Sequence, residues 1–268
     1  MWVTLDGLNI YYTTKGSGRS VLLIHGLSAH SFSWRRNIEP LAEFFRVYAL
    51  DLKGFGFSDK PLKSDYSPEG MANFIVQFMD ALGIPEAALI GNSMGGMIGL
   101  TVALQYPSRV THLVLVGSTG YPLRPKLRWK LLETPGLGDF LLRFVGKKDL
   151  QRGLRHCYYD SSKITSETLE GYYKPYLQDL NLKPQLLLAR KFKFDRPSPW
   201  ESQYSRIQIP TLLLWGREDR IVPVHHAYRF HREIKSSRLE ILEKTGHAPQ
   251  EENPDEFNKR VLQFLKNT

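Results

Sequence analysis

The sequence predicts an α/β fold in which helices cover a mostly parallel sheet and a helical segment interrupts the regular order. Short apolar runs alternate with helix-like stretches along most of the 268 residues, which is typical of a doubly wound sheet. The alternation stops over residues 121–205 and then resumes. That segment holds 16 of the 36 Lys and Arg residues but nine of the 27 Asp and Glu residues, so most of the net charge of +9 is local.

The expected strands are of two kinds. Near the N-terminus, residues 3–5 and 10–13 flank Asp6-Gly7, a pair typical of a hairpin turn. The later runs lack strict alternation, as expected for strands buried on both faces, and they lie at 21–24, 45–50, 87–90, 113–116, 211–216 and 239–242.

Helices are expected between these strands, at 34–44, 67–82, 94–106, 224–234 and 254–266. The second has a capping serine, Ser67, followed by proline, and it stops at Gly83, whereas Pro107 ends the third. Residues 121–205 carry no convincing strand signal. We therefore expect a core of residues 1–120 and 206–268, interrupted by a helical insertion of residues 121–205.

Composition disfavours several classes of protein. No apolar run approaches the roughly 18 residues of a membrane span, and no basic segment precedes an apolar one near the N-terminus. We therefore expect a cytoplasmic protein without stable membrane insertion. The single cysteine, Cys157, excludes an intramolecular disulfide and is only a weak candidate for a reactive thiolate.

The motif Gly91-Asn92-Ser93-Met94-Gly95 lies where an expected strand meets an expected helix. In this Gly-x-Ser-x-Gly context a tight turn presents the serine hydroxyl above the sheet, beside the positive end of the helix. A small-residue turn that only lets strand and helix pack closely is the alternative. The strand before and the helix after favour Ser93 as a nucleophile.

A serine nucleophile needs a base and an acid that orients the base. In the chain order Ser, acid, His, both partners should lie on loops at the carboxyl edge of the sheet. Asp219 follows the strand at 211–216, and His247 follows the strand at 239–242. Glu218 is an alternative acid, but successive side chains diverge, so only one should face His247, and we prefer Asp219.

Acyl transfer also needs an oxyanion hole, made of N–H groups aimed at the developing negative charge. We expect these donors to be the backbone N–H groups of Met94, directly after the nucleophile, and of Leu27, in the loop that begins with His25-Gly26. No group of His, Cys, Asp and Glu has metal-ligand spacing, so we expect neither a metal nor another cofactor. The histidines that we interpret as packed or solvated residues are His30, His112, His156, His225, His226 and His231.

Five blocks in order resemble the α/β-hydrolase fold superfamily, and the resemblance spans residues 3–264. These blocks are His25-Gly26 with Trp34 downstream, residues 51–59, residues 91–96, residues 216–223 and residues 246–249. The resemblance implies Ser93, Asp219 and His247 as a catalytic triad. It also implies that residues 121–205 form a helical cap after the sixth strand, and that block 51–59 is a structural turn in which Lys53 replaces a common arginine.

The elbow Gly-Asn-Ser-Met-Gly-Gly is similar to that of the meta-cleavage-product hydrolases, which cut carbon–carbon bonds in ring-fission products. Two positions depart from that subfamily. Ala248 replaces a tryptophan after the catalytic histidine, and Tyr172 lies nearest to the position of a cap arginine that holds the substrate carboxylate. Arg190 or Lys191 could substitute for that arginine. Ser93 argues against haloalkane dehalogenases and epoxide hydrolases, which use an aspartate.

These residues predict a serine hydrolase that cleaves small to medium carboxylic esters through an acyl-enzyme. A carbon–carbon bond hydrolase of meta-cleavage products is the alternative, and a ligand receptor of the same fold is a third hypothesis. The aromatic residues expected to form an apolar pocket over Ser93 are Trp129, Phe140, Phe144, Tyr158, Tyr159, Tyr172, Tyr173, Tyr176, Phe192, Phe194 and Trp200.

The positive charge of residues 121–205 has three interpretations. A solvated helical surface is the commonest one for such runs. Residues 124–130 interleave basic side chains with Trp129, so contact with an anionic membrane surface is another. Steering of anionic substrates is the third. Because no nucleic-acid-binding motif accompanies the charge, we expect a small-molecule ester substrate and no nucleic acid, with the oligomeric state left open.

Overall fold

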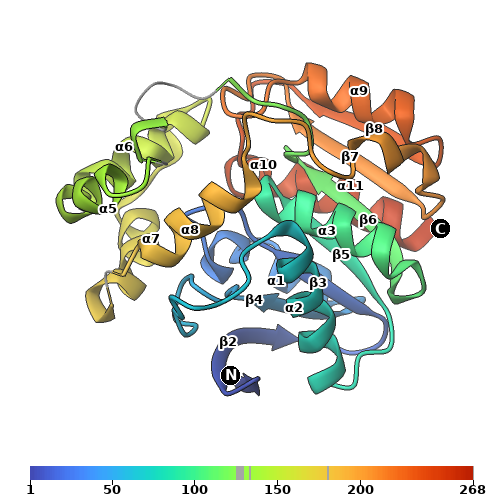
Figure 1. The fold of residues 1–268 in the computed structure, drawn as a ribbon. Helices are drawn as coiled ribbons and strands as arrows, with labels where there is room; N and C mark the ends of the chain where they lie inside the picture. The colour runs from blue at the N-terminus through green and yellow to red at the C-terminus, as the bar shows by residue number, and fades with distance from the viewer. Residues whose placement is uncertain (125–129, 133, 180, 268) are drawn as a thin grey trace.

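An eight-stranded sheet lies at the centre of the computed structural model, which describes residues 1–124, 130–132, 134–179 and 181–267 (Figure 1). The spatial order of the strands is β1-β2-β4-β3-β5-β6-β7-β8. Their bounds are β1 (Trp2–Leu5), β2 (Leu8–Lys15), β3 (Ser20–Ile24), β4 (Arg46–Leu50), β5 (Ala87–Asn92), β6 (Val110–Val116), β7 (Thr211–Gly216) and β8 (Ser237–Leu242).

The pairing of these strands makes most of the sheet parallel. Strands β1, β2 and β4 pair antiparallel, whereas β3 pairs in parallel with β4 and β5, and β5 to β8 follow in parallel order. The carboxyl ends of β3, β5, β6, β7 and β8 therefore share one edge of the sheet, where ligands bind in open parallel sheets. The predicted α/β fold with a mostly parallel sheet is confirmed.

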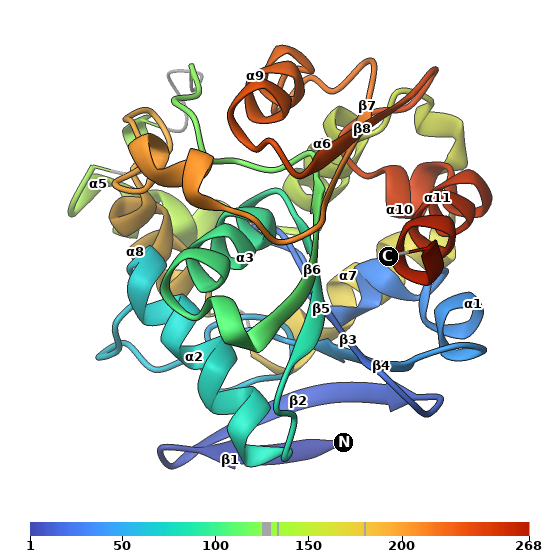
Figure 2. The ribbon, with the colours of Figure 1, turned by 90° about the vertical axis from the view of Figure 1, so that its right-hand side faces the viewer.

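Helices cover both faces of the sheet (Figure 2). The flanking helices are α1 (Ile38–Ala42), α2 (Pro68–Ala81), α3 (Met94–Gln105), α9 (His225–Glu233), α10 (Pro249–Glu252) and α11 (Pro254–Asn267), with short 3-10 turns η1 (Ser31–Trp34) and η2 (Pro107–Arg109). Alternate residues of β3 enter two apolar clusters. Leu22 packs on the side of α2, α3 and α9, and Leu23 packs on the side of α1 and α11.

The single helix predicted for residues 34–44 is wrong. The chain forms η1 and then α1, with residues 35–37 in a turn between them. Proline is tolerated in the first turn of a helix, and starting α1 at Ile38 places Pro40 there. In the turn, Asn37 Nδ2 donates to Asn258 Oδ1 of α11 at 2.8 Å, and the Arg36 carbonyl accepts from Asn258 Nδ2 at 3.0 Å.

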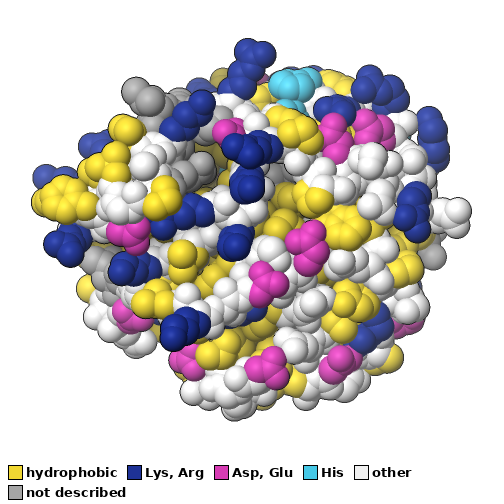
Figure 3. All heavy atoms as spheres, viewed as in Figure 1, with side chains coloured by type: hydrophobic (Ala, Val, Ile, Leu, Met, Phe, Trp, Pro, Cys, Tyr) yellow, Lys and Arg dark blue, Asp and Glu magenta, His cyan; other side chains and the backbone are white. Residues whose placement is uncertain are grey.

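Between β6 and β7, the described residues form helices and no strand. We call α5 (Leu137–Leu141), η3 (Leu142–Phe144), α6 (Lys147–Cys157), η4 (Ser161–Lys163), α7 (Ser166–Gln178), α8 (Lys183–Phe192) and η5 (Glu201–Arg206) the inserted helices. Many Lys and Arg side chains lie over this part of the surface (Figure 3). Across the described ranges, no helix is both long and apolar enough to cross a membrane.

Candidate active site

Ser93 occupies a strained turn between β5 and α3. Its dihedral angles are φ 56° and ψ −117°, a conformation that a residue with a side chain rarely adopts. Hydrogen bonds on both sides hold it there, because Ser93 N–H donates to Val116 O at 2.8 Å and Ser93 O accepts from Thr119 N–H at 3.1 Å. The turn therefore presents the hydroxyl at the carboxyl edge of the sheet.

The two flanking glycines are required by close backbone approach. A Cβ on Gly91 would lie 2.3 Å from Gly95 O, and a Cβ on Gly95 would lie 2.2 Å from Ile24 O at the end of β3. Any side chain at either position would force the elbow open. The spacing of the Gly-x-Ser-x-Gly motif thus follows from the packing of β3, β5 and α3.

Asp219 and His247 form a buried pair. Asp219 Oδ2 lies 2.7 Å from His247 Nδ1, and its other oxygen accepts from the N–H groups of Ile221 and Val222, each at 2.8 Å. The Asp219 side chain is 0% exposed. The alternative acid, Glu218, instead accepts from the N–H of Thr245 at 2.9 Å. Of the two carboxylates, Asp219 is the one that can orient the imidazole.

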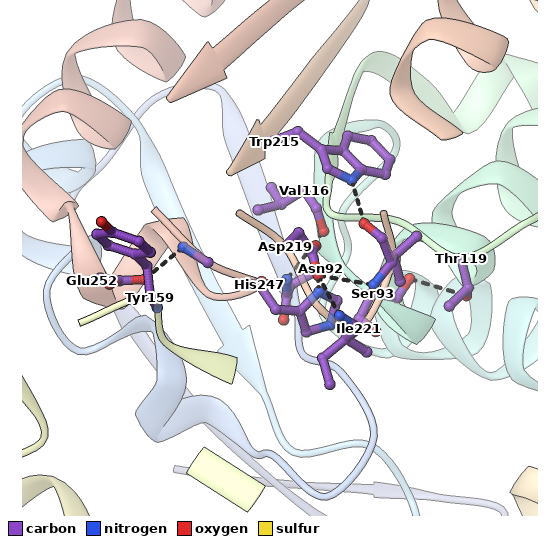
Figure 4. A network of polar contacts seen from close by, with 12 residues as sticks. Asn92, Ser93, Val116, Thr119, Tyr159, Trp215, Asp219, Ile221, His247 and Glu252 are labelled. Atoms are coloured by element: carbon purple, nitrogen blue, oxygen red, sulfur yellow. Dashed lines mark hydrogen bonds and ion pairs between the residues drawn. The ribbon is translucent and has the colours of Figure 1, made fainter. Parts of the chain in front are cut away.

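Asn92 connects the nucleophile turn to the histidine loop. Its Nδ2 donates to Val116 O at 3.0 Å and to His247 O at 3.2 Å, so β5, β6 and the loop after β8 are joined beside Ser93. Figure 4 shows Ser93, Asp219 and His247 gathered at this point. The structure therefore brings all three candidate triad residues together.

Gly117 is a site residue that the sequence reasoning missed. It has φ 50°, and a Cβ there would lie 3.0 Å from Asp219 Oδ2 and 3.1 Å from His247 Nδ1. The backbone of Gly117 therefore packs directly against the hydrogen-bonded side chains of Asp219 and His247. The only signal available in the sequence was a glycine directly after the strand at 113–116, which alone indicates no more than a strand end.

The loop after β3 lies against the nucleophile turn. A Cβ on Gly26 would be 3.2 Å from Ser93 Cβ. Buried His25 fixes this loop: its Nε2 accepts from Leu52 N–H at 3.0 Å, so its Nδ1 carries the proton and donates to Gly26 O at 2.8 Å. Because the peptide is planar, this bond turns the following N–H, that of Leu27, away from His25. Burial lowers the pKa of His25 to about 4, which keeps the ring neutral.

Other titratable residues near the site have structural surroundings. Burial raises the pKa of the Cys157 thiol to about 12, so the thiolate interpretation has no support. His226 is packed at 5% exposure, whereas His225 and His231 of α9 are exposed, so each fits the interpretation as a packed or solvated residue. Among the described residues, no group of three or more His, Cys, Asp and Glu side chains is placed to hold a metal ion.

Only some of the aromatic residues that were expected to form an apolar pocket over Ser93 are buried. Phe140 and Phe144 are 52% and 70% exposed, and Tyr159 is 41% exposed, so these three face solvent. They lie on short or terminal elements whose helical periodicity is too brief to indicate a buried face. The predicted aromatic residues that are buried are Tyr158, Tyr172 and Phe192. Trp129 and most of the basic stretch 124–130 lie outside the described residues.

Two of the three candidate carboxylate-binding residues, Arg190 and Tyr172, are already engaged, whereas Lys191 is exposed. Arg190 Nη2 lies 3.0 Å from Asp139 Oδ2 and donates to Thr134 O at 3.2 Å. Tyr172 Oη donates to the buried Glu251 carboxylate at 2.5 Å. The hydroxyl proton of Tyr172 is therefore already donated to Glu251, whose carboxylate also pairs with the Arg35 guanidinium.

Comparisons with known proteins fit this geometry. The family described as alpha/beta hydrolase fold matches residues 19–254, and the chain belongs to this family. An uncharacterized hydrolase, YugF, of Bacillus subtilis is 32% identical over 98% of this chain and 96% of its own length. A 2-hydroxy-6-oxo-6-phenylhexa-2,4-dienoate hydrolase of Comamonas testosteroni is also 32% identical, over 98% of this chain and 93% of its own length.

Among solved structures, a bacterial membrane phospholipase A has a TM-score of 0.85 and 30% identity, covering 100% of this chain and 85% of that one. The chain is thus similar both to a dienoate hydrolase and to a phospholipase A. It is a hydrolase of the α/β-hydrolase fold family, and the bond that it cleaves must be argued from its own residues.

Proposed function

We propose that this chain is a serine hydrolase that cleaves small to medium carboxylic esters through an acyl-enzyme. The observation that carries the proposal is the hydrogen-bonded pair of Asp219 and His247 beside the strained turn of Ser93. A hydroxyl is a weak nucleophile until an adjacent base takes its proton, and this arrangement supplies the base and its orienting acid.

In the proposed mechanism, Ser93 Oγ attacks the ester carbonyl while His247 Nε2 takes the hydroxyl proton. The Asp219 carboxylate stabilises the resulting imidazolium through Nδ1. The N–H groups of Met94 and Leu27 donate to the oxyanion of the tetrahedral intermediate. When this intermediate collapses, His247 gives its proton to the leaving alkoxide, which departs as the alcohol and leaves Ser93 acylated.

Water then completes the turnover. His247 takes a proton from a water molecule, which attacks the acyl carbonyl, and the same proton returns to Ser93 Oγ as the carboxylic acid leaves. We also propose that the inserted helices form a cap over this site, with residues 121–205 as its extent and residues 1–120 and 206–268 as the catalytic core. Buried aromatic residues of the cap would contribute the apolar surface that an acyl chain needs.

Hydrolysis of carbon–carbon bonds in meta-cleavage products is the second candidate, because the Comamonas relative is named as a hydrolase of a dienoate. Two local observations favour the ester. Arg190 is paired with Asp139, and Tyr172 donates to Glu251, so two of the three candidate partners for a substrate carboxylate already have partners. The third, Lys191, has an exposed side chain at the end of α8.

Turnover of p-nitrophenyl esters from acetate to octanoate, measured beside loss of colour from a dienoate substrate, tests both candidates. We expect ester turnover to exceed dienoate turnover and Ser93→Ala to abolish it. Faster dienoate turnover would transfer the proposal to the second candidate. Equal ester rates in wild type and Ser93→Ala would refute a role for Ser93.

A further inference from the structure

Two consecutive carboxylates follow the candidate catalytic histidine on α10 and reach the inserted helices. Glu252 is 2% exposed, and its carboxylate accepts hydrogen bonds from three backbone N–H groups. One oxygen, Oε1, accepts from Asp160 N–H at 2.7 Å. The other, Oε2, accepts from Tyr159 N–H at 3.1 Å and from Gly246 N–H at 2.7 Å (Figure 4).

The carboxylate of Glu252 thus bridges two parts of the chain. Tyr159 and Asp160 lie between α6 and η4 of the inserted helices, whereas Gly246 directly precedes His247. A carboxylate with two oxygens is suited to accept several N–H groups at once, and these charge-assisted bonds are stronger than neutral ones.

The inserted segment also contacts the backbone of the histidine itself. His247 N–H donates to Cys157 O at 2.6 Å. A Cβ on Gly246 would lie 2.3 Å from the same carbonyl and 2.7 Å from Tyr159 N, so the two segments are in direct backbone contact. The successive N–H groups of Gly246 and His247 are therefore held by Glu252 and by residue 157, respectively.

We propose that Glu252 is a positioning residue that couples residues 157–160 of the inserted helices to the placement of His247. This inference rests on the proposed role of His247 as the base. The N–H groups of Gly246 and His247 directly precede the His247 Cα. Holding both of them fixes the backbone from which the imidazole side chain projects. A displacement of residues 157–160 should therefore move the imidazole relative to Ser93, and the proposed cap would adjust the base as well as cover the site.

The neighbouring Glu251 makes a different set of contacts. It accepts from Arg35 of the core and from Tyr172 of α7, while Arg35 Nη2 donates to Thr168 Oγ1 at 3.1 Å. Glu251 therefore also joins α10 to the inserted helices, but through side chains rather than through the peptide before His247. Glu251 thus attaches the inserted helices, and the adjacent Glu252 positions the base.

Glu252→Gln tests the proposal with little change in volume. A glutamine has one acceptor oxygen, so its NH₂ group must face either Asp160 N–H or the N–H groups of Gly246 and Tyr159. The matched control is Lys163→Met, because Lys163 Nζ donates at 2.9 Å to the backbone carbonyl of Glu252. This control loosens the same two segments while leaving the carboxylate and its three donors in place.

Two readouts separate positioning from folding. The first is kcat and KM for p-nitrophenyl butyrate across pH, and the second is the rate at which a fluorophosphonate labels Ser93, each normalised to the native fraction from circular dichroism. We expect Glu252→Gln to lower kcat and the labelling rate about tenfold or more, since small misplacements of a catalytic group are costly. KM should change less than twofold, Lys163→Met should stay within twofold of wild type, and Glu252→Asp, which keeps the charge, should recover part of the loss.

Wild-type kcat and labelling rate in Glu252→Gln would overturn the proposal. A loss that disappears after normalisation to the native fraction would also overturn it, because the residue would then act on stability alone. Equal losses in Lys163→Met would overturn it as well, because the effect would then come from attachment of the inserted helices and not from the Glu252 carboxylate. If the wild type labels at Ser93 but cleaves no ester, the proposed ester substrate fails, and the labelling rates still test Glu252.

Discussion

At the scale of single residues, the site depends on backbone groups that face one another without side chains between them. Ser93 holds a positive φ that costs on the order of 1–3 kcal/mol, and this cost is met by its hydrogen bonds to β6 and to Thr119. Gly117 approaches the Asp219–His247 pair by its backbone alone. Adding one carbon atom at such a position should affect the chemistry more than the fold.

Gly117→Ala should lower kcat at least tenfold, because its Cβ would press on Asp219 Oδ2 and His247 Nδ1 and disturb their hydrogen bond. Gly83→Ala is the matched control. Gly83 also has a positive φ, at 64°, but a Cβ there meets nothing within 4 Å, so it adds backbone strain without the collision. Steady-state kinetics on p-nitrophenyl butyrate would measure both variants, and similar kcat values for the two would contradict the expectation.

Asp219→Asn and Glu218→Gln should separate the two candidate acids. The asparagine cannot stabilise an imidazolium and can favour the wrong tautomer of His247, so kcat should fall by roughly 10³ or more. Glu218 accepts only from backbone at Thr245, so Glu218→Gln should keep kcat within about fivefold. A larger effect at Glu218 than at Asp219, in kinetics on the same ester, would reverse the assignment.

Cys157 should resist alkylation in the native protein. Burial raises the pKa of its thiol to about 12, so the reactive thiolate is scarce at pH 8. Iodoacetamide should leave the native chain unmodified over hours and modify it stoichiometrically in denaturant, as followed by intact mass. Rapid modification of the native chain would contradict the raised pKa and show that the half-buried thiol is reactive in the folded state.

At the scale of elements, local sequence signals predicted the regular helices and strands whose first and last residues carry a clear capping or turn signal. Ser67 accepts from Gly70 N–H at 3.0 Å and begins α2, and Gly83 takes a positive φ just after it. The break between η1 and α1 was not predicted, because it depends on Asn258 of α11, a residue more than two hundred positions away. Tertiary contacts of this kind leave no trace in local periodicity.

Stability should depend on pH through α9. Burial lowers the pKa of His226 to about 4. His225 and Arg229 make smaller contributions in the same direction, whereas Asp219 acts in the opposite direction. The unfolded chain then binds the proton more readily, so the free energy of unfolding should fall as pH decreases from about 6.5 to 4, by up to about 3 kcal/mol for this residue. His226→Phe should flatten that dependence in urea titrations. An unchanged slope would contradict this, because it would mean that the pKa of His226 is the same in the folded and unfolded chains.

At the scale of the whole molecule, the order of strands and helices could be predicted from local signals. Apolar runs indicate the strands, and capping residues, glycines and prolines indicate where the helices begin and end. The identity of the candidate triad was predicted from one motif and from chain order. The sequence could not reveal that Gly117 and Glu252 adjoin the site, since their neighbours lie on other strands and on the inserted helices. It also could not separate exposed from buried aromatic residues in short helices such as α5.

Charge on the inserted segment should affect the approach of anionic substrates. Residues 121–205 carry 16 basic against nine acidic side chains, and exposed charges act over about one Debye length, roughly 10 Å at 0.1 M salt. If the segment steers substrates, kcat/KM for an ester with a free carboxylate should fall severalfold between 20 and 300 mM NaCl. The value for a neutral ester of similar size should stay constant, and parallel behaviour of the two would exclude steering.

The hydrogen bond from Asn92 to the carbonyl of His247 joins residues 155 positions apart in the chain. The chain must therefore be synthesised past β8 before the site can exist, because the histidine loop follows β8, which is an edge of the sheet. Contacts so distant in sequence form late and slowly during folding. In refolding experiments, the recovery of esterase activity should therefore lag behind the recovery of the helix signal. The onset of hydrolysis would then mark the docking of β8.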